Sequence, residues 1–250
     1  MHSFINFRSR EGSDTTVPQF RLLPQKCLDM KPQDTFVRQP HSLNVVQLKI
    51  LDLPNFRLID SNSVRGGCLA AKSADTFKEL KSAGIETIID LRKEGGYDSK
   101  YAQKCNQSGL NYFNFKLKEN MAAFNPPLTT KLHTDEFSDM MNSFVKQLGY
   151  FFNLMNEGRV YMGCLLGLHR TDLAVSMNYL LNPKEPQSPP VLSHMFIKDE
   201  TNFTNKRIGS VKNLIKNLTP EHIKELCLAE DFKEIFDERV LKLRLMNLVK

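Results

Sequence analysis

The sequence predicts an α/β protein with a mostly parallel central sheet flanked by helices and with a helical C-terminal extension. Between residues 55 and 182, short segments rich in β-branched and aromatic residues alternate with segments of helical spacing. This alternation favours a parallel sheet, because a chain that leaves one parallel strand needs a crossover, usually a helix, before it begins the next. After Pro183, a polar linker leads into further segments with helical patterns.

The alternating part consists of five expected strands and four expected helices. The strands are expected over residues 56–60, 63–65, 86–91, 112–117 and 159–162, and the helices over 74–83, 97–108, 134–156 and 171–181. Glycines follow several of these segments, which is typical of helix ends. The long helix over 134–156 has apolar residues three and four apart, so we expect one of its faces to pack on the sheet.

The pattern divides the chain into three regions. Residues 1–45 are polar and contain four prolines, so we expect an irregular N-terminal arm. Residues 46–185 form the α/β domain, and residues 186–250 form the helical extension. Within the extension, Thr219-Pro220-Glu221 is a typical helix start. Residues 231–250 place apolar side chains on one helical face, which predicts packing on the core, with a membrane surface as the alternative.

Composition narrows the class of protein. The 250 residues carry a net charge of +6, which suits an anionic ligand, but no basic stripe interleaved with aromatics indicates nucleic acid. The five cysteines are odd in number and have no CxxC spacing, so we expect neither a disulfide framework nor a zinc site. No cofactor is expected. The sequence shows no secretory signal pattern and no apolar run of roughly 20 residues, which favours a cytoplasmic protein. Export by another route stays open, as does the oligomeric state.

The segment from Val160 to Thr171 carries the chemistry. A strand ends, five residues separate Cys164 from Arg170, and a helix begins. A loop of this kind turns successive backbone N–H groups inward, and the positive end of the following helix adds to them, so the segment predicts a phosphate cradle. The predicted phosphate-binding loop comprises Cys164, Leu165, Leu166, Gly167, Leu168, His169, Arg170 and Thr171.

Each chemical role in this loop follows from the residue type. The positive field of the loop favours the thiolate of Cys164, which makes it a nucleophile. The planar fork of Arg170 grips two phosphate oxygens at once. Gly167 permits a backbone conformation that a side chain opposes, and the Thr171 hydroxyl is placed to donate to the Cys164 sulfur. The alternative is an inert buried cysteine beside an arginine that caps a helix.

These residues resemble the cysteine-based protein tyrosine and dual-specificity phosphatases. The resemblance rests on Cys-Leu-Leu-Gly-Leu-His-Arg-Thr, on Asn55-Phe-Arg, on Val64-Arg-Gly-Gly67 and on the stretch from Lys81 to Arg92, and it covers roughly residues 54 to 182. It is strongest with the atypical dual-specificity phosphatases of bacteria, plants and fungi. It implies the fold of that family, a phosphocysteine intermediate, no metal, and a structural role for Arg92.

Two positions depart from the family pattern. Gly163 stands where the family usually has histidine before the nucleophile, which predicts a weaker nucleophile. Asp172 stands where the family often has glycine. Its carboxylate suits the first turn of a helix but opposes the charge of a bound phosphate. Both departures keep open a weak enzyme or a catalytically poor phosphate-binding module.

The general acid is chosen by position. Asp135 lies where a proline-containing loop meets the long helix, so a loop closure can bring it over Cys164, and we select it as proton donor. Glu119 at the other end of that loop and Asp139 one turn into the helix are the alternatives. An ordinary acid in a first helical turn is the other interpretation of Asp135.

The leading functional hypothesis is a hydrolase, a protein phosphatase acting on phosphotyrosine or with dual specificity. A phosphatase of phosphoinositides or inositol phosphates is the second, although Leu165, Leu166 and Leu168 argue against a highly charged substrate. A phosphate-binding module for a phosphorylated partner is the third. A sulfurtransferase or arsenate reductase also uses a cysteine loop, but the Gly-x-His-Arg-Thr continuation disfavours both.

Overall fold

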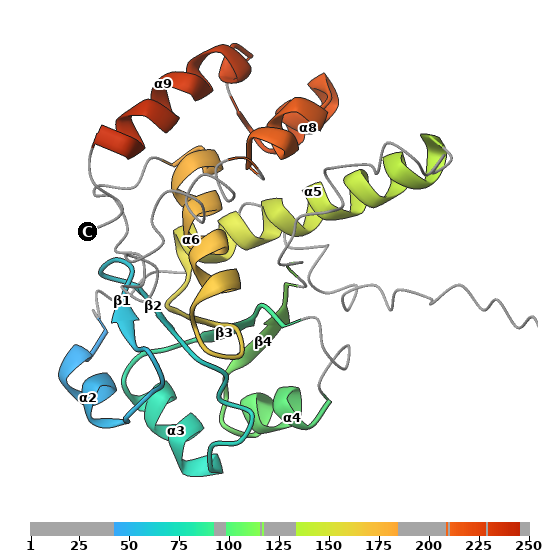
Figure 1. Ribbon diagram of the computed structural model, residues 1–250. Coiled ribbons are helices and arrows are strands. Elements are labelled where there is room, and N and C mark those ends of the chain that lie inside the picture. Colours follow the sequence, from blue (N-terminus) through green and yellow to red (C-terminus); the bar gives the residue numbers. More distant parts are fainter. Residues whose placement is uncertain are drawn as a thin grey trace, which may run out of the picture. The chain divides into compact units, whose positions relative to one another are not determined.

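The computed structural model describes residues 43–92, 99–115, 117, 134–184, 209, 211–228 and 230–245. In chain order the elements are α2 (Val45–Ile50), β1 (Arg57–Leu58), β2 (Ser63–Gly66), α3 (Ala74–Ser82), β3 (Thr87–Asp90), α4 (Ser99–Gln107), β4 (Asn111–Asn114), α5 (Thr134–Glu157), β5 (Val160–Gly163), α6 (His169–Leu181), α8 (Pro220–Glu225) and α9 (Phe232–Leu245). Residues 211–217 are also helical. The predicted α/β class is confirmed, with helices at the C-terminal end of the chain (Figure 1).

The sheet has the strand order β1-β2-β5-β3-β4. Strands β2, β5, β3 and β4 are parallel, and β1 pairs with β2 in the antiparallel sense. The last residue of the central strand β5 is Gly163. It pairs with Gly66 of β2 on one side and with Asp90 of β3 on the other. The carboxyl ends of three strands therefore meet around the segment that follows β5.

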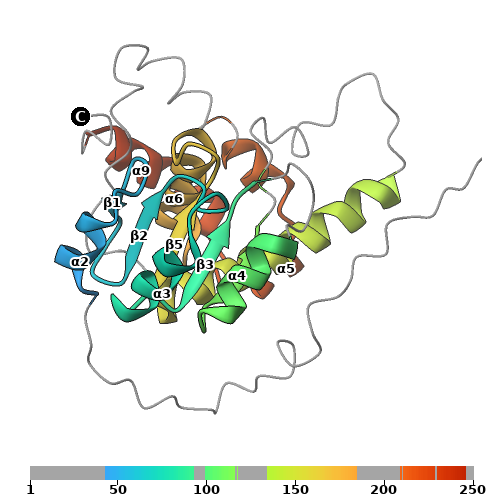
Figure 2. The same ribbon diagram turned by 90° about the horizontal axis from the view of Figure 1, so that it is seen from below.

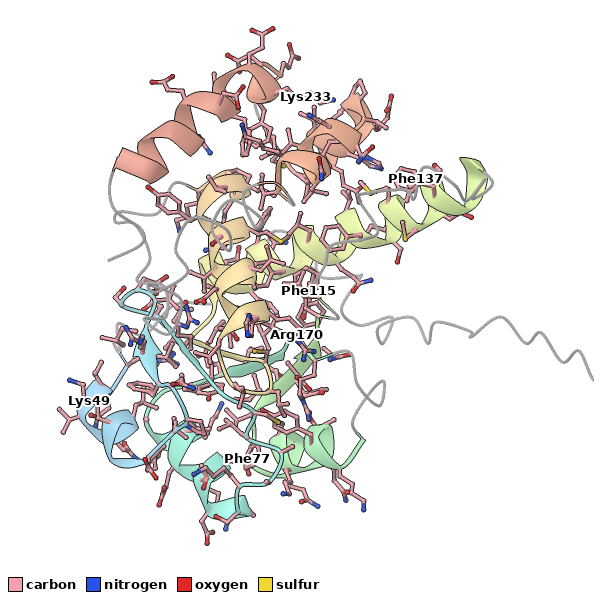
Figure 3. The ribbon with its side chains drawn as sticks, viewed as in Figure 1. Lys49, Phe77, Phe115, Phe137, Arg170 and Lys233 are labelled. Atoms are coloured by element: carbon pink, nitrogen blue, oxygen red, sulfur yellow. The ribbon has the colours of Figure 1, made fainter. Side chains whose placement is uncertain are left out.

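The two faces of the sheet carry separate hydrophobic clusters, because successive side chains of a strand point to opposite faces. Ile88 and Tyr161 lie in one cluster with residues of α2, α3 and α4, among them Phe77. Ile89 and Met162 lie in the other with residues of α5, α6, α8 and α9. Figure 2 shows the helices on both sides of the sheet, and Figure 3 labels Phe77 of the first cluster and Phe115 of the second.

Stacked aromatic rings pack α5 against the sheet. The ring of Phe115, just after β4, stacks on Phe151 of α5 at 5.1 Å between centroids and on Phe144 at 5.7 Å. Phe151 is fully buried. These contacts confirm the expected packing of one face of the long helix.

The C-terminal helices pack on the same core. Phe232 and Phe236 of α9 belong to the cluster of α5 and α6, which agrees with core packing rather than a membrane surface for this segment. Thr219 caps α8, with Pro220 as its first residue, as the sequence predicts. None of the described helices is both long and apolar enough to cross a membrane.

The start of the packed region holds a short helix that the sequence pattern does not reveal. Asn44 caps α2 by accepting from the Gln47 backbone N–H at 3.1 Å, and its own N–H donates to the Ala83 carbonyl. Leu43 is buried in the cluster around α3. A helix of six residues is too short to show a helical period, so it forms here through its cap and its tertiary contacts. The rest of the expected arm, residues 1–42, lies outside the described residues.

The ring stack predicts the cost of removing Phe151. Phe151→Ala deletes a fully buried ring and leaves a cavity, so we expect it to lower the free energy of unfolding by about 3–5 kcal/mol. Urea denaturation measures this loss. The control Val46→Ala changes a side chain that is 72% exposed and is expected to stay within about 0.5 kcal/mol of the parent. Similar values for the two variants would contradict the packing described for α5.

Candidate active site

The candidate active site is the loop Cys164–Leu168 between β5 and α6. Because β5 is the central strand, the loop emerges between the carboxyl ends of β2 and β3 (Figures 1 and 2). The Gly163 carbonyl accepts from the Leu91 N–H at 2.8 Å, which ties the start of the loop to the end of β3. Ligands of open α/β sheets bind in this position, beyond the carboxyl ends of the strands.

Three consecutive loop carbonyls accept hydrogen bonds from residues of the neighbouring chain segment. The Leu165 carbonyl accepts from the Cys68 backbone N–H at 3.1 Å. The Leu166 carbonyl accepts from the Asn55 side-chain amide at 2.7 Å. The Gly167 carbonyl accepts from the Arg65 guanidinium at 2.8 Å. The outward side of the loop is therefore fixed by three separate donors.

The N–H groups of the same peptides face the other way. In a planar trans peptide the C=O and the following N–H point in opposite directions, so the N–H groups of Leu166, Gly167 and Leu168 point away from those donors. Among the described residues, none of these three N–H groups donates to a backbone carbonyl outside a helix or strand. These three N–H groups and the start of α6 are the groups that the predicted anion cradle would use, and the cradle stays a prediction.

Gly167 is required by both its conformation and its surroundings. Its φ is +71°, which a side chain opposes. A Cβ atom at this position would lie 2.3 Å from the carbonyl carbon of Gly66 and 2.6 Å from the nitrogen of Gly67. The loop therefore folds directly against the backbone that follows β2.

The close approach to Gly66 and Gly67 also explains why glycine stands at position 163, where the family pattern has histidine. A Cβ atom at Gly163 would lie 2.8 Å from the Gly66 carbonyl oxygen and 2.9 Å from that of Gly67. A histidine at this position therefore has no room unless the backbone after β2 moves. At Gly163, strand β5 therefore lies closer to the end of β2 than a histidine side chain allows.

Cys164 and Thr171 are linked, but in a different way from the one predicted. The Cys164 backbone N–H donates to the Thr171 hydroxyl oxygen at 3.1 Å. Both residues are buried, with Cys164 3% exposed and Thr171 0%. The hydroxyl thus accepts from the backbone of Cys164, which fixes the first turn of α6 to the start of the loop. The predicted donation from this hydroxyl to the sulfur stays a prediction.

Arg170 lies in the first turn of α6 (Figure 3) and is 5% exposed. Its neighbour His169 is exposed. The structure begins α6 at His169, two residues before the start expected from the sequence, so both residues belong to the helix N-terminus rather than to the loop. A cationic side chain here adds its charge to the positive end of the helix dipole.

The Asp172 carboxylate, expected to oppose a bound phosphate, has a cationic partner. It forms an ion pair with Arg65 of β2, and the two side chains are 0% and 1% exposed. The positive charge of Arg65 offsets the carboxylate within the protein. Sequence reasoning gave Arg65 no role, although a charged residue within a buried strand is an unusual feature that marks it.

The neighbouring strand end is held by a second buried ion pair. The Arg92 guanidinium donates to both carboxylate oxygens of Asp90, at 2.8–3.1 Å, and the Tyr112 hydroxyl donates to the same carboxylate at 2.8 Å. The Asn114 amide donates to the backbone carbonyls of Asp90 and Arg92. This network agrees with the structural role that the resemblance implies for Arg92.

The thiols of the described cysteines differ in environment. Burial, with a smaller effect of the Asp90 charge, raises the pKa of Cys105 to about 12, so this thiol stays protonated at neutral pH. Burial also raises the pKa of Tyr161, with smaller effects of the Cys68 and Cys164 thiols, and the Tyr161 hydroxyl donates to the Gly67 carbonyl at 2.8 Å. Cys227 is exposed on the extension. Of these cysteines, Cys164 is the one that begins the loop between β5 and α6.

Of the three candidates for proton donor, only Asp139 has a described side chain. Asp135 is in the first turn of α5, and its side chain lies outside the description; Asp139 is exposed one turn further, and Glu119 lies outside the described residues. In Figures 1 and 2 the first turns of α5 extend away from the loop between β5 and α6. The assignment of Asp135 therefore stays a prediction.

Metal ligands do not gather at this site. Within the described part of the chain, no group of three or more His, Cys, Asp and Glu side chains is placed to hold a metal ion.

Comparison with known proteins gives distant similarities. No protein-family model matches the sequence. The fold is similar to two crystal structures of a "Putative phosphatase (DUF442)" from Shewanella putrefaciens CN-32, with TM-scores of 0.42 and 0.38 and identities of 15% and 14%; they cover 69% and 79% of this chain and 96% and 97% of theirs. It is also similar to the crystal structure of PTPMT1, with a TM-score of 0.34, 12% identity, and coverage of 75% and 99%.

All these identities are 12–15% and all the TM-scores lie below 0.5, so these likenesses assign no function to the chain. In sequence, 117 residues are 27% identical to a biotin synthase of Psychromonas ingrahamii, which is 47% of this chain and 30% of that protein. The chain thus spans under a third of that enzyme, whose activity is not carried over.

The close approach at Gly163 predicts that the family histidine will not improve this protein. Gly163→His forces a side chain against the Gly66 and Gly67 carbonyls, so we expect a loss of stability of about 1–3 kcal/mol, the usual cost of overpacking. Thermal unfolding and hydrolysis of an aryl phosphate are measured together. A variant as stable as the parent and more active would show that the site has room for the histidine.

Proposed function

We propose that this chain is a cysteine-dependent phosphatase that hydrolyses phosphomonoesters through a phosphocysteine intermediate. The single observation that carries the proposal is the loop between β5 and α6, which has Cys164 at its start, Arg170 just after its end and three consecutive carbonyls held by donors outside the loop. A nucleophile inside an anion cradle is the arrangement that phosphoryl transfer to a thiol needs.

The reaction divides into two displacements at phosphorus. The Cys164 thiolate attacks phosphorus, an S–P bond forms, the ester P–O bond breaks, and the leaving oxygen takes a proton from the general acid. Water then attacks phosphorus and gives a proton to the same carboxylate, the S–P bond breaks, and inorganic phosphate leaves. The loop N–H groups and the Arg170 fork hold the phosphoryl oxygens in both steps.

Phosphoprotein, with tyrosine or dual specificity, is the substrate class that we favour. Leu165 and Leu166 are 59% and 55% exposed on the loop, whereas Leu168 is buried. Two apolar side chains on the loop favour a single phosphate on an apolar carrier, such as the ring of phosphotyrosine, over a carrier with further phosphates. Because Asp172 offsets the charge of Arg65, that arginine adds little attraction for extra anionic groups.

An inositol phosphate or phosphoinositide is the second candidate substrate. The exposed His169 beside the loop and the net charge of +6 favour it. A phosphate-binding module with little turnover is the third possibility, and measurement of turnover separates it from both enzymes. A reducing compartment such as the cytoplasm suits any of the roles that depend on a free thiol.

Substitution of the nucleophile tests the proposal directly. Cys164→Ser removes the thiolate but leaves the cradle, so turnover of an aryl phosphate is expected to disappear while a phosphate analogue still binds. Vanadate is expected to inhibit the parent protein, and chelators are expected to have no effect. Full activity of the serine variant, or loss of activity with a chelator, would reject the mechanism.

The dependence of the rate on leaving group and on pH tests Asp135 as the general acid. Asp135→Asn should reduce hydrolysis of an alkyl phosphate by about 10²–10⁴-fold and that of an activated aryl phosphate far less, because only the alkyl leaving oxygen depends on a proton. The high-pH limb of the kcat profile should also flatten. Equal small losses on both substrates, with that limb intact, would remove Asp135 and make Glu119 the first candidate.

Charge on the loop predicts substrate choice. Replacement of Leu165 and Leu166 by lysine adds two cations beside the phosphate, so kcat/KM for an inositol polyphosphate should rise relative to that for an aryl phosphate, by about tenfold or more. The same change at Leu58, which is 40% exposed on β1, is the control and should leave the ratio unchanged. An unaltered ratio in the loop variant would show that the substrate does not reach these two leucines.

A further inference from the structure

Arg65 is a buried cation whose side chain hydrogen-bonds to the active-site loop. Its side chain is 1% exposed, it forms an ion pair with Asp172, and it donates to the Gly167 carbonyl at 2.8 Å. One guanidinium therefore connects β2 to two parts of the site, the first turn of α6 and the middle of the loop. The planar fork of arginine serves two acceptors at fixed angles, which a lysine ammonium on a flexible stem does not.

The hydrogen bond from Arg65 to the Gly167 carbonyl also affects the orientation of the Leu168 N–H, which belongs to the same peptide. The peptide between Gly167 and Leu168 is planar, so a donor that holds the Gly167 carbonyl outward also holds the Leu168 N–H inward. Gly167, at a φ of +71°, has no side chain to restrict the rotation of this peptide. An external donor is therefore needed to keep the peptide in one orientation.

Asp172 is the partner of Arg65 in the buried ion pair. An arginine buried this completely is costly unless its charge is paired. Asp172 supplies that pairing from the first turn of α6, and its own N–H donates to the Leu168 carbonyl at 2.7 Å. The carboxylate thus lies under the loop, bound to Arg65, and the net charge that this pair presents to a phosphate is close to zero.

We propose that Arg65, paired with Asp172, is a positioning residue of the phosphate loop: it holds the Gly167–Leu168 peptide with its N–H toward the bound phosphoryl group. The proposal rests on the phosphatase function proposed above and gives the departure at Asp172 a role in it. The residue touches no reacting atom and acts on the phosphate through the loop backbone. Its loss is expected to weaken binding of phosphate and of the transition state together.

Two variants separate positioning from folding. Arg65→Lys keeps a cation beside Asp172 but cannot also reach the Gly167 carbonyl in the same geometry. The double variant Arg65→Met with Asp172→Leu removes both charges and fills their volume with apolar groups, a replacement that buried ion pairs often tolerate. The control is Arg92→Lys, which alters the other ion pair, Asp90–Arg92, at the end of β3; the carbonyls of Leu165, Leu166 and Gly167 accept from other residues.

The experiment measures the melting temperature, the inhibition constant for vanadate, and kcat/KM for an aryl phosphate. We expect both Arg65 variants to fold, to bind vanadate about 10–100-fold more weakly and to lose kcat/KM by a similar factor, the scale of a small misplacement of catalytic groups. Arg92→Lys should change the melting temperature without changing vanadate inhibition.

Three results would overturn the proposal. One is a folded Arg65 variant whose vanadate inhibition and kcat/KM stay within about twofold of the parent. Another is failure of both Arg65 variants to fold, which would assign the pair to the fold alone. The third is an equal loss of vanadate binding in Arg92→Lys. A parent protein that neither binds vanadate nor turns over would instead reject the phosphatase function, so the two failures are distinguishable.

Discussion

The backbone that follows β2 lies in direct contact with the loop that follows β5, and the rest of the site depends on this approach. A Cβ atom at Gly163 or Gly167 would lie within 3 Å of the backbone of Gly66 or Gly67. At this separation the Cys68 N–H reaches the Leu165 carbonyl, and the Arg65 side chain reaches under the loop. Widening the gap would release the donors that turn the loop N–H groups inward.

Electrostatics at the site follow from the same packing. Buried charged side chains lie near the loop: Arg65, Arg170 and Asp172, with Asp90 at the end of β3. Because Arg65 and Asp172 pair with each other, this pair adds little net charge to the field at the start of α6. The exposed Leu165 and Leu166 agree with a substrate that carries a single phosphoryl group.

Much of the fold was predictable because its signals are local. The buried run from Thr87 to Asp90 reads as a strand without knowledge of its neighbours, and the spacing of Cys164 and Arg170 identifies the loop. The short helix α2 was missed because it depends on a cap and on contacts with α3. The role of Arg65 was also beyond prediction, since its acceptor in the loop, Gly167, lies 102 residues further along the chain. Gly163 and Asp172 looked like defects in the sequence, and only their neighbours in space explain them.

The most direct test of the account is to look for the covalent intermediate. The protein is mixed with an aryl phosphate, quenched in denaturant within the first turnovers, digested and analysed by mass spectrometry. We expect a phosphate on the peptide that contains Cys164, and we expect none in the Cys164→Ser variant or in the untreated protein. Turnover with no phosphate on Cys164, or with phosphate on another residue, would contradict the assignment of Cys164 as the nucleophile.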